Sequence, residues 1–242
     1  MTASHTRRIT AALLMAIGAA GCGSATGGGA QASAQPPIPR PSPSTIAQAK
    51  ADSVRHPYTE ADVQFMSGMI GHHAQAIVMA NWAPTHGATP SVQRLAERII
   101  NAQQDEIATM QRWLGDRLKP VPEATPAGMK MMMNGVEHVM LMPGMLTETQ
   151  MKQLDQAKGP EFDRLFLRFM IQHHRGAVSM VKDLFDSWGA GQDETVFKFA
   201  SDVNVDQSTE IDRMEKMLVA LTFGVESQIG RASCRERVLV QV

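Results

Sequence analysis

The chain has 242 residues, a formal net charge of −1, and hydrophobic residues at 43% of its positions. It contains no block of basic residues, so nucleic-acid binding, which depends on contacts to phosphates, has no electrostatic support. Without the terminal segments described below, residues 57–226 remain, a length typical of one domain with a substantial core.

The first 21 residues have the pattern of a bacterial lipoprotein signal peptide. Arg7 and Arg8 precede an apolar run, residues 9–20, that is too short to span a bilayer. Small residues then lead to Cys22, although the leucine that usually stands three places before such a cysteine is absent. We expect an extracytoplasmic chain anchored to the membrane through a lipid on Cys22. The alternative is an ordinary signal peptide with an incidental cysteine.

Residues 22–56 are rich in Gly, Ala, Ser, Gln and Pro, and their only branched apolar residues are Ile38, Ile46 and Val54. Such a stretch buries too little apolar surface to offset the entropy lost on ordering. It therefore predicts a disordered tether that holds the folded domain away from the membrane.

Four long helices are predicted next, because apolar residues recur there at steps of three and four. These patterns cover residues 59–84, 89–120, 160–189 and 193–221. Thr59 with Asp62 gives a capping signal for the first helix, and Pro90 lies in the first turn of the second. No stretch alternates convincingly with period two, so the domain is predicted to be all-α.

A connection rich in proline and methionine, residues 120–159, joins the two pairs of helices. Thr147 with Gln150 predicts a short helix within it. Eight of the 18 methionines lie between Met129 and Met151. Two interpretations of these methionines stay open: adaptable packing, and a strip that captures soft metal ions through thioethers.

The C-terminal segment, residues 227–242, shares none of the helical periodicity that precedes it. Residues 229–238 resemble the translation of a sequencing adapter, and we assign no function to them; a genuine but unpatterned tail is the alternative. If Cys234 is set aside with this segment, Cys22 is the one cysteine left. Neither a disulfide framework nor a thiolate metal site is then available.

An internal repeat relates the two pairs of helices. Eight of the 18 positions from Asp62 to Met79 are identical to the residues 101 places later, among them two histidine doublets. A second run, with Gln103, Glu106, Ile107, Met110 and Leu114, returns 104 places later as Gln207, Glu210, Ile211, Met214 and Leu218. The repeat predicts one helical hairpin used twice about a pseudo-twofold axis, most simply as a four-helix bundle.

The histidine doublets are the candidate metal site. Adjacent residues on a helix point about 100° apart, so His72 and His73 do not easily hold one ion together. We expect one histidine of each doublet to face the bundle interior and the other a helix boundary. In the pseudo-twofold arrangement, His72 and His173 approach each other across the core.

The candidate ligands combine imidazoles and thioethers, which suit copper better than magnesium or calcium. They are, in order, His72 and His173; Met69 and Met170; His73 and His174 as alternates; and then Met79, Met180, Glu106, Glu210, Met110 and Met214. The alternative is that the histidines bind no metal and form a polar layer that specifies how the helices pair.

Glu106 and Glu210 lie on the same helical stripes as Met110 and Met214. A charged glutamate is rarely buried without a partner. Three roles therefore stay open for the two glutamates: orienting a histidine as a hydrogen-bond acceptor, binding the metal directly, or lying on the surface without a role.

Asp62 and Asp163 are expected to stabilise the first turns of their helices through the helix dipole, with metal ligation as the alternative. Gln103 and Gln207 are candidates for a hydrogen bond to each other across the core.

Several separated motifs together resemble the ferritin-like family catalogued as domain of unknown function 305, over residues 57–222. They are Phe65-x-x-x-Met69-Ile70-x-His72-His73 with Met79, Met142-Pro143-Gly144-Met145, Gly159-Pro160-Glu161-Phe162-Asp163, and Phe166 with Met170-Ile171-Gln172-His173-His174-Arg175-Gly176-Ala177. The resemblance implies a ferritin-like four-helix bundle in an exported bacterial protein. It also implies copper binding through His and Met, because some relatives are linked to periplasmic copper.

Ferritin-like bundles often carry a di-iron centre, which needs Glu-x-x-His on two helices. No glutamate of this chain is followed by a histidine three places later, so that centre is disfavoured. The sequence also has no Gly-rich phosphate loop and no serine nucleophile motif.

Three functional hypotheses remain. The first is a membrane-anchored, extracytoplasmic protein that binds copper for storage, buffering or tolerance. The second is a non-catalytic structural or interaction bundle whose histidines only fix packing. The third, with less support, is a redox enzyme that uses the same ligands around a transition metal. The sequence indicates neither the oligomeric state nor a protein partner.

Overall fold

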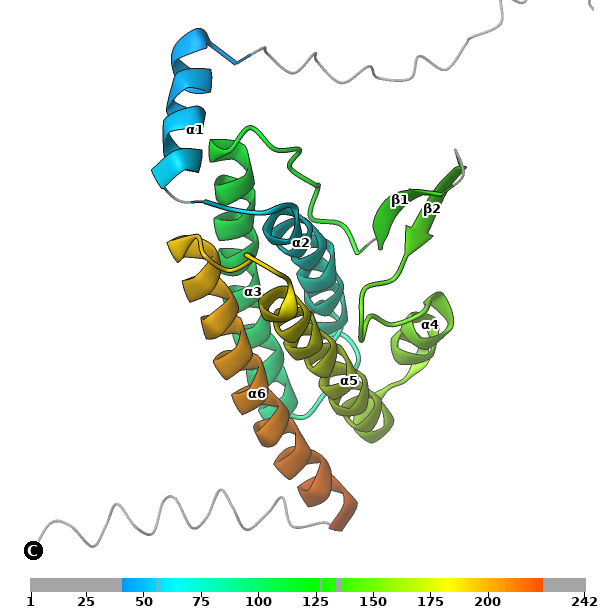
Figure 1. The fold of residues 1–242 in the computed structure, drawn as a ribbon. Coiled ribbons are helices and arrows are strands. Elements are labelled where there is room, and N and C mark those ends of the chain that lie inside the picture. Colours follow the sequence, from blue (N-terminus) through cyan, green and yellow to red (C-terminus); the bar gives the residue numbers. More distant parts are fainter. Residues whose placement is uncertain (1–40, 56, 127, 134–135, 224–242) are drawn as a thin grey trace, which may run out of the picture. The chain divides into compact units, whose positions relative to one another are not determined.

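The structure is a computed structural model that describes residues 41–55, 57–126, 128–133 and 136–223 (Figure 1). The predicted signal peptide, the lipidation candidate Cys22 and the predicted tail 227–242 lie outside the described residues. Within the described part of the chain, no helix has the length and apolar character that a membrane span requires.

Four long helices form the domain, as the sequence predicts. They are α2 (Glu60–Asn81), α3 (Pro90–Asp116), α5 (Gly159–Asp186) and α6 (Glu194–Phe223). α2 packs along α3, α5 packs along α6, and the two hairpins meet through α2 and α5 (Figure 1). The predicted fold class, an all-α bundle of two helical hairpins, is confirmed.

The helices begin where the local sequence signals place them. At the start of α2, the Asp62 amide donates to Thr59 Oγ1 at 3.3 Å and the Thr59 amide donates to Asp62 Oδ2 at 2.7 Å. The predicted short helix α4 (Glu148–Gln156) begins with the same kind of capping box, between Thr147 and Gln150. Each box satisfies amide groups that the first helical turn leaves without a partner.

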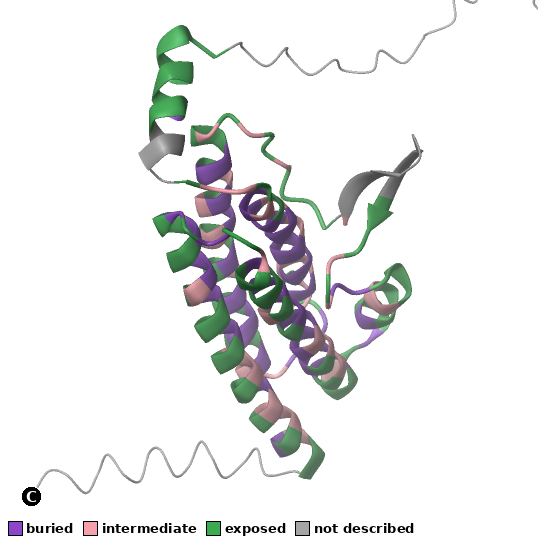
Figure 2. Ribbon diagram, in the orientation of Figure 1, coloured by how far each residue is buried: buried purple, intermediate pink, exposed green. Residues whose placement is uncertain are grey.

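The hydrophobic core consists of two clusters, one on either side of the four histidines of the doublets. One cluster combines the N-terminal halves of α2 and α6 with the C-terminal halves of α3 and α5, and it includes Phe65 and Met69. The other combines the opposite halves, and it includes the repeat partners Phe166 and Met170. Buried residues follow the inner faces of all four helices (Figure 2). We call His72, His73, His173 and His174 the histidine layer.

Two buried aspartates form hydrogen bonds between the two hairpins. The Gly191 amide, in the turn between α5 and α6, donates to Asp62 Oδ1 at 2.7 Å. The Thr89 amide, in the turn between α2 and α3, lies 3.2 Å from both carboxylate oxygens of Asp163. Each aspartate therefore binds the interhelical turn of the opposite hairpin. Asp62 lies in the first turn of α2, as predicted, whereas Asp163 lies beyond the first turn of α5.

The crossover between the hairpins contains a two-stranded antiparallel sheet that the sequence analysis did not predict. β1 (Met129–Met133) pairs with β2 (Val136–Met140), with Met129 opposite Met140. Methionines at successive positions obscured the period of two. The Asn134-Gly135 pair between the strands is nevertheless a typical hairpin signal in the sequence.

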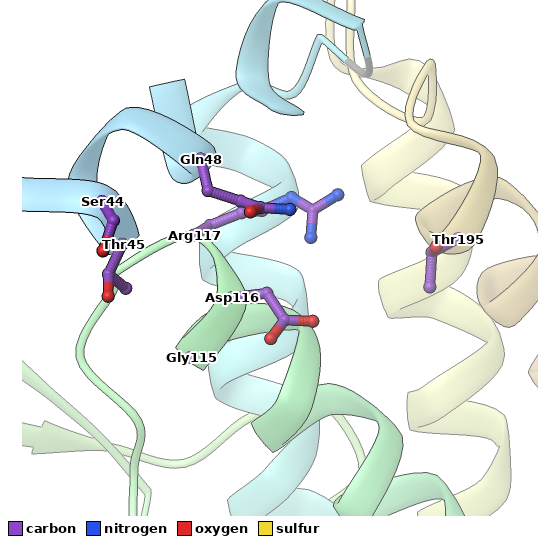
Figure 3. A pocket seen from close by; sticks show the side chains of 7 residues that line it. All are labelled: Ser44, Thr45, Gln48, Gly115, Asp116, Arg117 and Thr195. Atoms are coloured by element: carbon purple, nitrogen blue, oxygen red, sulfur yellow. The ribbon is translucent and has the colours of Figure 1, made fainter. Parts of the chain in front are cut away.

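A second difference lies in the segment 22–56, predicted to be a disordered tether, because α1 (Pro43–Arg55) is helical there. Ser42 Oγ accepts a hydrogen bond from the Thr45 amide at 3.1 Å, and Pro43 occupies the first helical position. Local capping and helix-forming Ala, Gln and Lys residues outweigh the low apolar content. α1 borders a pocket with the end of α3 and the start of α6 (Figure 3), lined by Ser44, Thr45, Gln48, Gly115, Asp116, Arg117 and Thr195.

Residues 142–147, which we call the strap, cross α2 and α5 at the level of the histidine layer. Gln75 holds the strap by two bonds to the backbone of Leu146, from Nε2 to the carbonyl at 3.0 Å and from the amide to Oε1 at 2.7 Å. Gln172 Nε2 donates to the Gly144 carbonyl at 3.2 Å. The strap lies so close to α5 that a Cβ atom on Gly176 would approach Gly144 Cα to 2.6 Å.

We expect Gly176→Ala to lower the melting temperature, because the added methyl group displaces the strap from α5. Overpacking of this kind costs about 1–3 kcal/mol. The control is Gly115→Ala in α3, where the nearest atom, Val121 Cγ2, lies 4.0 Å from the added carbon. Helix propensity alone would stabilise that variant by up to about 1 kcal/mol. Equal melting temperatures for the two variants would contradict the tight contact.

Candidate metal centre

His72 and His173 meet at the centre of the domain. They occupy equivalent positions in α2 and α5, and both are fully buried. Their ring centroids are 3.8 Å apart, with an interplanar angle of 39°. The structure thus brings together the two histidines that the repeat predicts to face each other.

The two rings are held in one tautomer by backbone carbonyls. His72 Nε2 lies 2.9 Å from the carbonyl oxygen of Pro143 in the strap. His173 Nε2 lies 3.0 Å from the carbonyl oxygen of His72 itself. A carbonyl oxygen only accepts hydrogen bonds, so both Nε2 atoms donate and both Nδ1 atoms carry a lone pair. Neither Nδ1 atom has a hydrogen-bond partner.

Burial keeps both rings neutral. The pKa of His72 is lowered to about 3, first by burial and second by the neighbouring His73. Burial also lowers the pKa of His173 well below its ordinary value, followed by the effect of His72. Neutral imidazole is the form that binds a metal ion. The two Nδ1 lone pairs are therefore free over the whole physiological pH range.

The second histidine of each doublet faces the partner helix of its own hairpin. His73 Nε2 lies 2.6 Å from Glu106 Oε2 on α3, and His174 Nε2 lies 2.8 Å from Glu210 Oε2 on α6. The histidines are fully buried, and the glutamate side chains are 18% and 14% exposed. The Nδ1 atoms of both rings lack a hydrogen-bond partner. In all four imidazoles of the layer, Nε2 lies next to an acceptor and Nδ1 is unpartnered. The contact between His73 and Glu106 is close but does not have the geometry of a hydrogen bond.

The two glutamates form part of an acidic region on α3 and α6. Partial burial raises the pKa of Asp206, and the negative charges of Glu106, Asp202 and Glu210 raise it further. Gln103 and Gln207 are also buried, but they form no bond to each other, since both side-chain polar atoms of Gln103 lack a partner. The cross-core hydrogen bond considered for these glutamines is therefore absent.

The six predicted methionine ligands are divided between the two core clusters by the pseudo-twofold relation. One cluster contains Met69, Met110 and Met180, and the other contains their repeat partners Met170, Met214 and Met79. Each cluster thus presents one methionine of α2 and one of α5 on its own side of the histidine layer. Methionine side chains are therefore present in the core on both sides of the layer.

The donor set determines which metal ions fit. Among the described residues, no three His, Cys, Asp or Glu side chains are arranged to hold a metal ion. Paired neutral imidazoles between thioether-rich clusters suit a softer ion, and copper accepts both donor types.

The sequence indicated the residues of the histidine layer, but not the groups that bind them. The doublets, the two glutamates and the six methionines are all found through the repeat. The roles of the Pro143 carbonyl and of Gln75 and Gln172 were missed, because the strap has no repeat partner. Asp62 and Asp163 were found as repeated positions, yet their partners in the opposite hairpin have no sequence signal.

Comparison with known proteins gives one family over most of the domain. A sequence profile described as "Domain of unknown function (DUF305)" matches residues 62–218. The crystal structure of a DUF305 protein from Streptomyces coelicolor, described as secreted, is similar with a TM-score of 0.55 and 29% identity. The similarity covers 67% of this chain and 92% of that one.

Two further proteins are similar to the chain. The structure of CopM in its Cu(II)-bound form has a TM-score of 0.50 and 30% identity, over 65% of this chain and 95% of CopM. Uncharacterized protein L153 of Acanthamoeba polyphaga mimivirus is 41% identical over 56 residues, which is 23% of this chain. The match spans 37% of the length of that curated relative.

The burial of His72 predicts a stability that depends on pH. The pKa of His72 is about 3 in the folded protein, against about 6.5 for an unfolded histidine. Between these values only the unfolded chain binds the proton, so the free energy of unfolding falls as the pH falls from about 6.5 to about 3. Denaturant titration of the metal-free protein should give a shallower pH slope for His72→Gln, by up to about 1.4 kcal/mol per pH unit. Parallel pH profiles would contradict this assignment.

Proposed function

The chain belongs to the DUF305 family, and on this premise we propose that it is an extracytoplasmic copper-binding protein whose ligands lie in the histidine layer. One observation carries the proposal: the Nδ1 atoms of His72 and His173 are buried, without a hydrogen-bond partner, in rings that burial keeps neutral. A buried polar atom without a partner is costly, and a bound metal ion would supply the partner.

The residues have distinct roles in this proposal. His72 and His173 supply nitrogen ligands, and their Nε2–H bonds to carbonyl oxygens orient the rings as outer-shell contacts do in known metal sites. Met69 and Met170 are the next ligands, from opposite sides of the layer. Thioethers stabilise Cu(I) in particular. The remaining thioethers, of Met79, Met180, Met110 and Met214, surround these positions.

His73 and His174 are alternate ligands through their unpartnered Nδ1 atoms. Glu106 and Glu210 then act mainly on these two histidines, because each carboxylate lies within 2.8 Å of a ring nitrogen. Such a carboxylate fixes the ring orientation and increases the basicity of the ligand. We therefore assign Glu106 and Glu210 the role of orienting these histidines and not that of binding the metal directly.

Burial favours storage or buffering over catalysis. All four histidines are fully buried, and the strap binds His72 directly through the Pro143 carbonyl. A redox enzyme needs access for a substrate, and the layer is closed to it in this structure. A layer that only fixes packing would be expected to satisfy its polar atoms, whereas four Nδ1 atoms here lack a partner.

The comparisons support the metal and the location. CopM, which is similar over 95% of its length, has a solved structure in its Cu(II)-bound form. The Streptomyces coelicolor relative is described as secreted, and the present chain begins with the pattern of a lipoprotein signal peptide. These observations support the extracytoplasmic location, and we propose in addition that the domain is anchored through a lipid on Cys22.

The first test removes the paired imidazoles. We expect His72→Ala/His173→Ala to lower the affinity for Cu(I) by at least about 100-fold, since loss of outer-shell contacts alone costs 10–100-fold. The measurement is a Cu(I) titration against a competing chelator, with circular dichroism to monitor folding. The control is His86→Gln, because His86 is a buried histidine outside the layer that binds the Asp155 carbonyl at 2.8 Å. A double variant that binds Cu(I) as tightly as wild type would overturn the site.

The second test concerns the thioethers. Met69→Leu/Met170→Leu nearly conserves side-chain volume, so we expect little loss of stability. Affinity for Cu(I) should fall by roughly tenfold, a loss within the range known for contacts that support a metal site. Affinity for Cu(II) should change less, because thioethers prefer the softer ion. Equal losses for both oxidation states would argue against thioether ligation.

A further inference from the structure

Three aromatic side chains are exposed around the turn between α5 and α6. Trp188 is 100% exposed, Phe197 is 56% exposed and Phe185 is 41% exposed. The rings of Phe185 and Phe197 form an edge-to-face pair with centroids 5.8 Å apart. We call these three residues the aromatic tip. Large exposed aromatic side chains that gather at one place mark an interaction surface.

The turn that carries Trp188 is well defined by backbone hydrogen bonds. The Ser187 amide donates to the Leu184 carbonyl at 3.0 Å, and the Ala190 amide donates to the Ser187 carbonyl at 3.1 Å. Gly189 and Gly191 have φ angles of 75° and 68°, a conformation that favours glycine. The exposure of Trp188 is therefore a property of the turn geometry.

The aromatic tip lies at the end of the domain where the chain arrives from its N-terminal segment. The contact between Gly191 and Asp62 places the turn beside the first turn of α2, which begins directly after residues 57–59. The predicted anchor, Cys22, precedes Thr59 by 37 residues. A chain of this length easily allows the same end of the domain to reach the surface to which Cys22 is attached.

From this placement we propose that the aromatic tip contacts the lipid bilayer and sets which end of the domain faces the membrane. The proposal rests on the extracytoplasmic, membrane-anchored location that forms part of the proposed function. Tryptophan and phenylalanine suit this position, because tryptophan is enriched at the membrane–water interface and large aromatic rings bury much apolar surface there.

The charges around the tip indicate the kind of lipid. Lys182 pairs with Asp186, and Lys198 pairs with Asp202, one turn from the aromatic residues on each helix. These pairs leave no excess of positive charge that would attract anionic headgroups. The contact is therefore apolar and interfacial, and zwitterionic phosphatidylcholine is sufficient for it.

The test attaches the chain to vesicles independently of lipidation in the cell. The chain from residue 22 onward, with Cys234→Ser, is coupled through Cys22 to a maleimide lipid in phosphatidylcholine vesicles with brominated acyl chains. Bromine quenches tryptophan fluorescence on contact. Trp113 is buried and Trp82 lies in the turn between α2 and α3, so both serve as internal references. Variants are Trp188→Phe, and Phe223→Ser at the other end of α6, where the side chain is 73% exposed.

We expect bromine quenching in wild type and in Phe223→Ser, and its loss in Trp188→Phe. Quenching that is equal in wild type and Trp188→Phe would overturn the proposal. An oligomer in solution, detected by sedimentation and abolished by Trp188→Ser, would also overturn it, because a second copy would then cover the tip. Mass spectrometry of Cys22 in the exported protein tests the anchor, and Cu(I) titration tests the metal site, so those failures are distinguishable from this one.

Discussion

Four imidazoles enclosed in the middle of a helical bundle form the constraint on which the rest of this structure depends. Each ring is fully buried and needs an acceptor for Nε2, and the four acceptors are two backbone carbonyls and two carboxylates. The strap supplies a carbonyl to His72, α2 supplies its own carbonyl to His173, and two glutamates face the remaining rings. The apolar core is divided into two clusters because this polar layer runs through its centre.

The surroundings of the paired histidines are less symmetrical than the repeat in the sequence. The two hairpins are equivalent in sequence at the doublets, but only one crossover joins them, so only one strap reaches the layer. His72 is consequently bound by the strap, whereas His173 is bound by the helix that carries His72. A metal ion at the paired rings would therefore have unequal surroundings on its two sides. The covering segment contacts α2 through Gln75 and α5 through Gln172.

The parts of the fold that could be predicted are those with a signal in the local sequence. Capping residues and prolines mark where helices begin, and they lie close in the sequence to the helices that they start. The 101-residue repeat places the two histidine doublets at equivalent positions in α2 and α5. The bundle and the residues of the layer could therefore be predicted from the sequence. The partners of Asp62, Asp163 and His72 do not, because they are backbone atoms brought close by the packing of distant segments. The β1–β2 pair was missed for another reason: a run of methionines has no polar face to reveal alternation.

The aspartate contacts between the two hairpins are reciprocal. Asp62 binds the turn of the second hairpin, and Asp163 binds the turn of the first. An aspartate of each half thus binds a turn of the other half. Such a reciprocal contact is typical of the isologous interface of a twofold dimer. The contact between the halves therefore has the form that two copies of a single hairpin would give as a twofold dimer. The crossover has no repeat partner, and it binds both halves of this symmetrical contact through Gln75 and Gln172.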